Sequence, residues 1–332
     1  MKRSRRIGSL ASAGLVLLLL SGCEDGGEDS ANGAIPSGSI SGRVTTLSNQ
    51  PLVGAEILAY GAEESIWGDI SDADGHYVIA GLPDGEYQLI CSLQGFASDS
   101  NTTAVAMGQE TADQDLVLDA LPFVEDLQVA SHLYCQQILP PFIYTLSAQA
   151  QISDQDGFYD IAGAQLNLEG EYLATMIHDS AIGDLLGYSI IVPEDSLPGQ
   201  SIAAVMGKIF TCSVFDMSNN FAVSSPEMIR RCFEEVPYPI SPNFNETVYV
   251  PNPWLIWNPF DAPFLFTYTA QVYRDIGRIQ FYWQQSAMPM DQDSVQVDSL
   301  PNGYYFWTLL TVDEYGNSAQ SQPAYFYVDH LP

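Results

Sequence analysis

Residues 71–91 read SDADGHYVIAGLPDGEYQLIC, and this stretch determines the fold that the sequence predicts. Two turn sequences, at 72–75 (DADG) and 82–85 (LPDG), each precede a short run in which every second residue is apolar. Alternation with a period of two, bounded by turn residues, predicts β-strands with one buried face. The residues expected on the buried faces are Tyr77, Ile79, Tyr87, Leu89 and Cys91, the last as a small hydrophobic side chain.

The same alternation extends over residues 38–120, from Ile40 and Val44 at one end to Leu116 and Leu118 at the other. This segment resembles the carboxypeptidase regulatory-like domain, a prealbumin-type β-sandwich. The resembling pieces follow the order of that family and lie at 41–44, 50–57, 71–77, 81–87 and 94–96. The resemblance implies a β-sandwich that accompanies carboxypeptidases but carries none of their catalytic residues.

The first 22 residues have the layout of a secretory signal peptide. Four basic residues stand in the first six positions, and no charged residue follows until after Cys23. The uncharged run at 7–22 is shorter than the roughly 20 residues that a transmembrane helix needs. A basic start, a short apolar core and small residues before a cleavage site predict export.

Residues 20–23 read Leu-Ser-Gly-Cys, which resembles the lipobox of bacterial lipoprotein precursors. The resemblance implies cleavage before Cys23, diacylglycerol on its thiol and acylation of the new amino group. Each buried methylene contributes about 0.8 kcal/mol, so several acyl chains anchor a protein durably. We therefore expect an exported protein anchored to the bacterial cell envelope, at the outer membrane or cell surface rather than the inner membrane. Residues 23–37 would form a lipidated, flexible, acidic tether.

Two further sandwiches are expected after residue 120. In residues 121–236, the strands at 210–215 and 221–225 resemble the last two strands of bacterial immunoglobulin-like domains. In residues 237–332, a Gly-Tyr-x-x-Trp strand at 303–307 and an Asp-x-x-Gly-Asn turn at 313–317 resemble a fibronectin type III-like domain. The predicted fold class is all-β, with three β-sandwich modules in series after the signal peptide and tether.

The charge balance excludes nucleic acid as a partner. The chain of 332 residues has 41 acidic and 10 basic side chains, a net charge of −31. Without the four bases of the signal segment, 6 bases face 41 acids, a net charge of −35. Binding to phosphates requires clustered Lys and Arg. The expected partners are the membrane, through Cys23, and a protein or polysaccharide.

Three cysteines, Cys135, Cys212 and Cys232, are disulfide candidates, because an exported protein can be oxidised. Three thiols allow three single pairings, and their spacing does not choose among them. We favour Cys135–Cys232, since both lie in less regular stretches of the middle domain.

No catalytic residue is predicted. The four histidines (His76, His132, His178 and His330) are not spaced as in a zinc hydrolase. Residues 38–42 have Ile40 where a nucleophile elbow needs Ser. We expect no enzyme activity, no cofactor and no metal site.

Two Asp-rich turns, at 72–75 and 154–157, raise the question of calcium, which binds clustered carboxylates. An EF-hand needs Glu at its twelfth position, and these turns have Pro83 and Gln165 there. We expect turns in which Asp caps backbone N–H groups, although binding of calcium at either turn stays open.

Aromatic residues make up 11% of the chain and are dense after residue 253. Most should fill a core, but neighbours in the strand at 304–307 must point to opposite faces. The expected function is a structural, adhesive or scaffolding role in the envelope. The alternatives are carbohydrate binding by outward aromatics, with Trp307 as the residue to test, or an accessory part of a secreted hydrolase or transport system.

Overall fold

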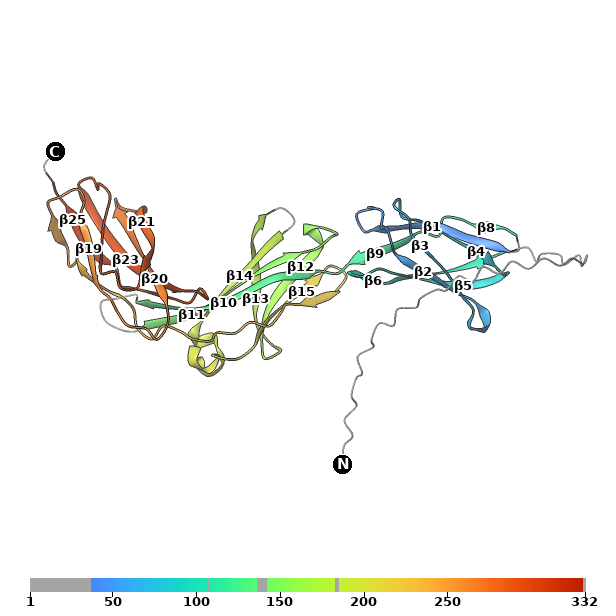
Figure 1. Cartoon of the computed structure of the whole chain (residues 1–332), viewed down its shortest axis with the longest axis horizontal. Helices are drawn as coiled ribbons and strands as arrows, with labels where there is room; N and C mark the ends of the chain where they lie inside the picture. The colour runs from blue at the N-terminus through green and yellow to red at the C-terminus, as the bar shows by residue number, and fades with distance from the viewer. Residues whose placement is uncertain (1–36, 107, 136–141, 183–184, 331–332) are drawn as a thin grey trace, which may run out of the picture. The chain divides into compact units, whose positions relative to one another are not determined.

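Strands dominate the part of the chain that the structure describes (Figure 1). The computed structural model describes residues 37–106, 108–135, 142–182 and 185–330. Those residues form 25 strands and five short 3₁₀ turns, with no α-helix, which confirms the all-β prediction. No helix among them has the length and apolar composition to cross a membrane. The predicted signal peptide and Cys23 lie outside the described residues.

The first sandwich consists of nine strands in two sheets. One sheet has the order β4-β1-β9-β6, with β8 paired to β1, and the other has the order β3-β2-β5-β7. The strands are β1 (Gly38–Thr46), β2 (Glu56–Tyr60), β3 (Ile66–Ile70), β4 (His76–Leu82), β5 (Gly85–Ser92), β6 (Phe96–Ala97), β7 (Asp99–Val105), β8 (Glu110–Thr111) and β9 (Leu116–Ala120).

Strand β1 is central because it pairs antiparallel with β4 and parallel with β9. Its residues Ile40 and Val44 are fully buried between the two sheets. The five positions that the sequence assigned to buried faces in β4 and β5 are all at most 3% exposed. Period-two alternation therefore identified the core of this sandwich correctly.

The second sandwich contains the strands β10 (Phe123–Cys135), β11 (Phe142–Ser153), β12 (Ile161–Leu168), β13 (Glu171–Ile182), β14 (Leu185–Pro193), β15 (Phe210–Asp216) and β16 (Phe221–Val223). Their order in the sheet is β16-β15-β12-β13-β14-β11-β10. The hairpin of β15 and β16 lies where the sequence predicted it. Strands β10 and β13, which have 13 and 12 residues, were not predicted from the sequence.

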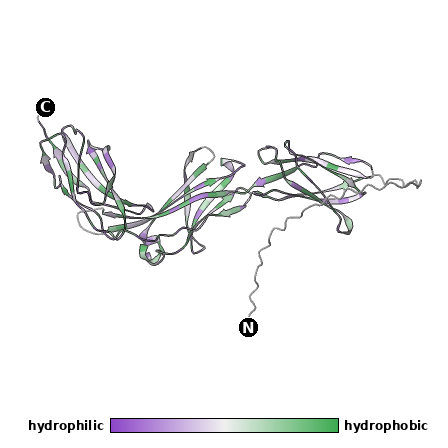
Figure 2. Cartoon of the chain, in the orientation of Figure 1, coloured by the Kyte–Doolittle hydropathy of each residue, from purple (hydrophilic) through white to green (hydrophobic). Residues whose placement is uncertain are grey.

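The third sandwich places the three-stranded sheet β17-β19-β22 and the strands β21-β20-β23-β25 around one core. The strands are β17 (Tyr238–Ser241), β18 (Glu246–Val248), β19 (Trp254–Asn258), β20 (Phe266–Asp275), β21 (Ile279–Pro289), β22 (Ser294–Gln296), β23 (Gly303–Asp313), β24 (Ser318–Gln320) and β25 (Ala324–Val328). Figure 2 shows hydrophobic and hydrophilic residues alternating along the strands. Trp257 and Trp307 are at most 1% exposed in this core.

Strand β10 belongs to the second sandwich, but it also pairs in parallel with β24 of the third sandwich. Buried Asn317 holds this contact, because its Oδ1 accepts hydrogen bonds from the N–H and the hydroxyl of Ser131, each at 2.9 Å. The side-chain amide of Asn317 donates to Asp313 Oδ2 at 3.0 Å. The sequence predicted separate sandwiches and gave no sign of this pairing; the predicted domain boundaries themselves stay predictions.

Replacing Asn317 with alanine is expected to destabilise the third sandwich by about 3 kcal/mol, because buried donors on Ser131 lose their acceptor. Four of the five tryptophans lie in residues 254–307, so tryptophan fluorescence during urea unfolding reports mainly on this region. The control is Asn258→Ala, at an exposed position of β19. Equal unfolding midpoints for the two variants would show that Asn317 is not a structural anchor.

Candidate functional site

An aromatic ladder crosses the outer face of the sheet β21-β20-β23-β25 in the third sandwich. Phe281, Tyr273, Phe306 and Tyr325 occupy paired positions on the four successive strands. The ring centroids are separated by 5.7 Å, 5.0 Å and 5.4 Å along this row, and Tyr273 and Phe306 are stacked. Such distances are those of favourable aromatic pairs, so the four rings form one continuous row.

A second aromatic pair extends the ladder. Tyr304 and Tyr327 face each other across β23 and β25, with centroids 4.6 Å apart. Tyr304 is 62% exposed, Phe281 is 53% exposed and Tyr325 is 46% exposed. The ladder is therefore an accessible aromatic surface on a protein of strong negative charge.

The alternation along β23 confirms that neighbouring aromatics point to opposite faces. Tyr305 and Trp307 are buried in the core, whereas Tyr304 is exposed. The indole N–H of Trp307 donates to the carbonyl oxygen of Pro242 at 2.8 Å. Trp307 was thus the wrong residue to nominate for ligand contact, because it points into the core.

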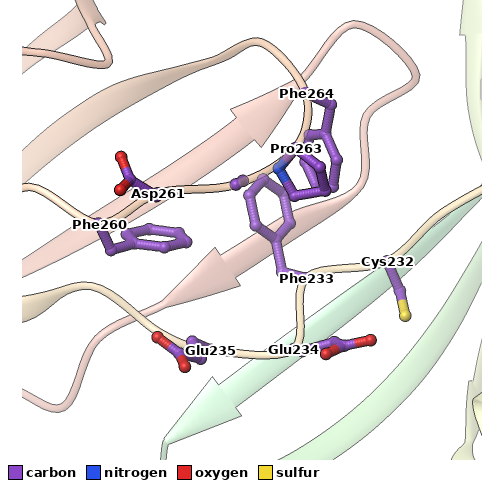
Figure 3. A pocket seen from close by; sticks show the side chains of 9 residues that line it. Cys232, Phe233, Glu234, Glu235, Phe260, Asp261, Pro263 and Phe264 are labelled. Atoms are coloured by element: carbon purple, nitrogen blue, oxygen red, sulfur yellow. The ribbon is translucent and has the colours of Figure 1, made fainter.

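A pocket beside the third core is lined by the segment Cys232–Glu235 and by residues 260–264 (Figure 3). The ring of Phe233 is packed edge-on against Phe260, Phe264 and Phe266, at centroid distances of 5.0 to 6.1 Å. Glu234, Glu235 and Asp261 contribute three carboxylates to the lining, and Cys232 contributes a thiol. The pocket is the margin of a structural contact that secures residues 232–235 to the third sandwich.

The cysteine predictions remain predictions. Cys212 is fully buried, and its Sγ lies 3.7 Å from the sulfur of Met176. Cys232 is half-buried, with its Sγ 3.6 Å from the sulfur of Met206. Cys135 is the last residue of β10. Cys91 is buried in the first core, as the alternation predicted.

The ring of His132 is held by neutral hydroxyls. The ring nitrogens of His132 lie 2.7 Å from Ser318 Oγ and 2.6 Å from Ser147 Oγ. Burial lowers the pKa of His132, so the ring is neutral at pH 7. Both ring nitrogens are bonded to hydroxyls and, among the described residues, to no carboxylate, so the arrangement differs from the base and orienting acid of a hydrolytic triad. Its geometry is that of a structural cross-strand contact.

The turn at 72–75 has the geometry that the sequence predicted. Asp72 Oδ1 accepts hydrogen bonds from the backbone N–H groups of Asp74 and His76, each at 2.9 Å. Gly75 has a φ of +81°, which glycine adopts without strain. The turn at 154–157 begins in the same way, with Asp156 N–H donating to Asp154 Oδ1 at 2.8 Å.

Comparison with known families assigns the first sandwich. Residues 39–119 match the family model of the carboxypeptidase regulatory-like domain. The first sandwich is therefore similar to that family over residues 39–119. In the structure this segment forms two sheets, with β1 paired in parallel with β9. No curated protein sequence matches the chain.

Several solved structures match the chain at low similarity. The major pilin subunit BcpA of Bacillus cereus is 10% identical, with a TM-score of 0.33, and the match covers 89% of this chain and 98% of the pilin. The FN1–FN3 domains of chicken CNTN1 are 12% identical, with a TM-score of 0.31 and coverage of 89% and 99%. A putative carbohydrate binding protein of Bacteroides uniformis is 10% identical, with a TM-score of 0.24 and coverage of 59% and 100%. These likenesses concern the fold class alone.

The sequence indicated the density of aromatics but not their alignment. Tyr273 and Phe281 lie on the consecutive strands β20 and β21, and strand pairing brings Phe306 and Tyr325, from later strands, into the same row. One signal in the sequence could have indicated the ladder. If Trp307 points into the core, alternation along the strand places Tyr304 and Phe306 on the outer face.

Truncation of Phe233 to alanine is expected to cost about 3 kcal/mol of unfolding free energy, because a buried ring in contact with three others is lost. Urea unfolding followed by tryptophan fluorescence measures this cost. Tyr249→Ala, at a site 73% exposed, is the control. An unchanged midpoint for Phe233→Ala would contradict the structural role assigned to the pocket.

Proposed function

We propose that this chain is an exported, lipid-anchored protein of the bacterial cell envelope that performs a structural, adhesive or scaffolding role without catalysing a reaction. The observation that carries the proposal is the lipobox-like sequence Leu-Ser-Gly-Cys at 20–23, directly after a signal-like segment. The described residues after this segment are all-β, and residues 39–119 among them match the carboxypeptidase regulatory-like domain. Such a chain suits the display of binding surfaces on rigid sheets.

The distribution of charge supports the same proposal. Both ion pairs found among the described residues belong to Arg231, which bonds Asp313 Oδ2 at 2.8 Å and Glu314 Oε1 at 3.1 Å. The remaining acidic side chains are mostly solvated, which keeps a protein soluble and repels it from anionic surfaces. A lipid anchor at Cys23 would hold the protein at a membrane in spite of that repulsion.

Metabolic labelling with a palmitate analogue tests the anchor. We expect wild-type protein expressed in a bacterial host to incorporate label and Cys23→Ala to lose it, because the thiol that accepts diacylglycerol is gone. Cys135→Ala should keep the label and serves as the matched control. Equal labelling of wild type and Cys23→Ala would refute the proposal.

Carbohydrate binding is a second candidate function, and the aromatic ladder of the third sandwich favours it. Sugar rings present apolar faces that stack on aromatic side chains, and the ladder offers six such rings across four strands. The surrounding positions on the same face are polar, such as Gln271 and Gln284, whose side chains are hydrogen-bonded to each other at 3.0 Å. A neutral polysaccharide is the partner that this surface suits.

A glycan array probed with the full chain in detergent tests this candidate. The double variant Tyr304→Ala/Tyr325→Ala is expected to weaken binding about tenfold or more, because it removes two accessible rings. Tyr159→Ala, at a site 90% exposed in the second sandwich, is the control and should bind like wild type. A wild-type chain that binds no glycan would eliminate carbohydrate binding as a function.

A further inference from the structure

Five aspartates converge at one end of the second sandwich. Asp119 lies in β9, Asp154 and Asp156 in the turn after β11, Asp160 in the 3₁₀ turn Phe158–Asp160, and Asp216 at the end of β15. Carboxylate oxygens of Asp119, Asp156 and Asp160 lie within 4.8 Å of one another. We call these five residues the aspartate cluster.

Four oxygen atoms of the aspartate cluster are buried and have no hydrogen-bond partner. They are Asp119 Oδ1, Asp154 Oδ2, Asp160 Oδ2 and Asp216 Oδ2. The strongest case is Asp216, which is 1% exposed and whose charge acts on both Asp154 and Asp160. A buried carboxylate oxygen without a partner among the described residues is costly, so a site that holds four of them suits a positively charged ligand.

The turn at Asp313 in the third sandwich has the same hydrogen bonds as the turn at Asp216, and there the side chain of Arg231 supplies a positive charge. In both hairpins, an aspartate Oδ1 accepts the N–H groups two and four residues ahead: Asp216 from Ser218 and Asn220, Asp313 from Tyr315 and Asn317. At Asp313 the other oxygen is bonded by Arg231 Nε at 2.8 Å and by Asn317 Nδ2 at 3.0 Å. At Asp216 the other oxygen has no partner. The two hairpins thus differ in positive charge, because Arg231 bonds Asp313 whereas no basic side chain among the described residues bonds Asp216.

We propose that the aspartate cluster binds Ca²⁺. Calcium takes six to eight oxygen ligands in a flexible geometry. Asp119, Asp156 and Asp160 bring three carboxylates together, and Asp154 and Asp216 lie close enough for their charges to act on Asp160 or on each other. Magnesium demands near-ideal octahedral geometry and keeps its waters, and zinc prefers nitrogen or sulfur ligands, which are absent from these five residues.

The surroundings of the cluster fit an ion that arrives from solvent. A hollow of about 460 Å³ borders Asp154 and is lined by Leu121, Phe123, Ser153, Asp154, Gln155 and Gly157. Asn220 Nδ2 donates to Asp119 Oδ2 at 3.0 Å, which orients that carboxylate. The N–H of Ala120 donates to Asp156 Oδ2 at 2.6 Å, which orients the second.

Calorimetric titration of CaCl₂ into the full chain in detergent, after removal of metal with EDTA, tests the proposal. Asp216→Asn keeps an oxygen that can accept both backbone N–H groups but removes the unpartnered charge. We expect this variant to lower the Ca²⁺ affinity by about tenfold or more. The matched control, Asp72→Asn, alters an exposed aspartate that caps a similar turn and should bind like wild type.

Thermal unfolding gives an independent readout. Saturating Ca²⁺ should raise the midpoint of wild type by about 5 °C. Asp216→Asn should lose this rise and, in EDTA, unfold at or above the wild-type temperature, because repulsion among the carboxylates is relieved. A structural role without an ion would instead make Asp216→Asn less stable with and without Ca²⁺. If that variant does not fold, Asp119→Asn makes the same test.

Two outcomes would overturn the proposal. One is wild-type protein that takes up no Ca²⁺ at millimolar concentration. The other is binding that Asp216→Asn and Asp119→Asn leave at the wild-type affinity, which would indicate diffuse attraction of the ion to an acidic surface.

Discussion

Buried carboxylates constrain this structure more than any other polar group, because the chain has so few bases to neutralise them. Asp313 is 6% exposed and is stabilised by Arg231 and Asn317, which together with Ser131 join β10 to β24. A charge buried without such partners is unfavourable by several kcal/mol. The architecture around Asp313 therefore depends on a single arginine from an irregular segment. At Asp216, where the same turn has no arginine, the structure places four further carboxylates instead.

Local turn chemistry and strand alternation could be predicted from the sequence. The turns at Asp72 and Asp154 follow from the preference of Asp for capping backbone N–H groups two to four residues ahead. The buried positions of β4 and β5 follow from the period of two. Both signals act within a few residues, so no knowledge of the topology is needed to detect them.

Strand β10 was not predicted because its buried residues pack against both the second and the third sandwich. Its burial alternates poorly: Val129, Ala130, Ser131 and Leu133 are all buried, since one face meets the second core and the other end meets the third sandwich. A register shift between Val124 and Asp126 breaks the alternation further. The convergence of the aspartates was hidden for a related reason. Asp119 and Asp216 are brought to the segment 154–160 by sheet topology and not by spacing in the chain.

The structural use of the scarce bases limits what the surface can recognise. Arg231 bonds Asp313 and lies 4.4 Å from the ring centroid of Phe264, while Arg43 donates to the carbonyl oxygen of Asp74 at 2.8 Å. Arg274 donates to the carbonyl oxygen of Asn302 at 3.0 Å. Because these side chains are engaged in holding turns and connections, they are poorly available for binding an anionic ligand. The described surface instead presents carboxylates and exposed aromatic rings, which favour cations and neutral polymers. Proteins that bind phosphates or nucleic acids depend on accessible Lys and Arg, so we expect this chain to recognise its ligands differently.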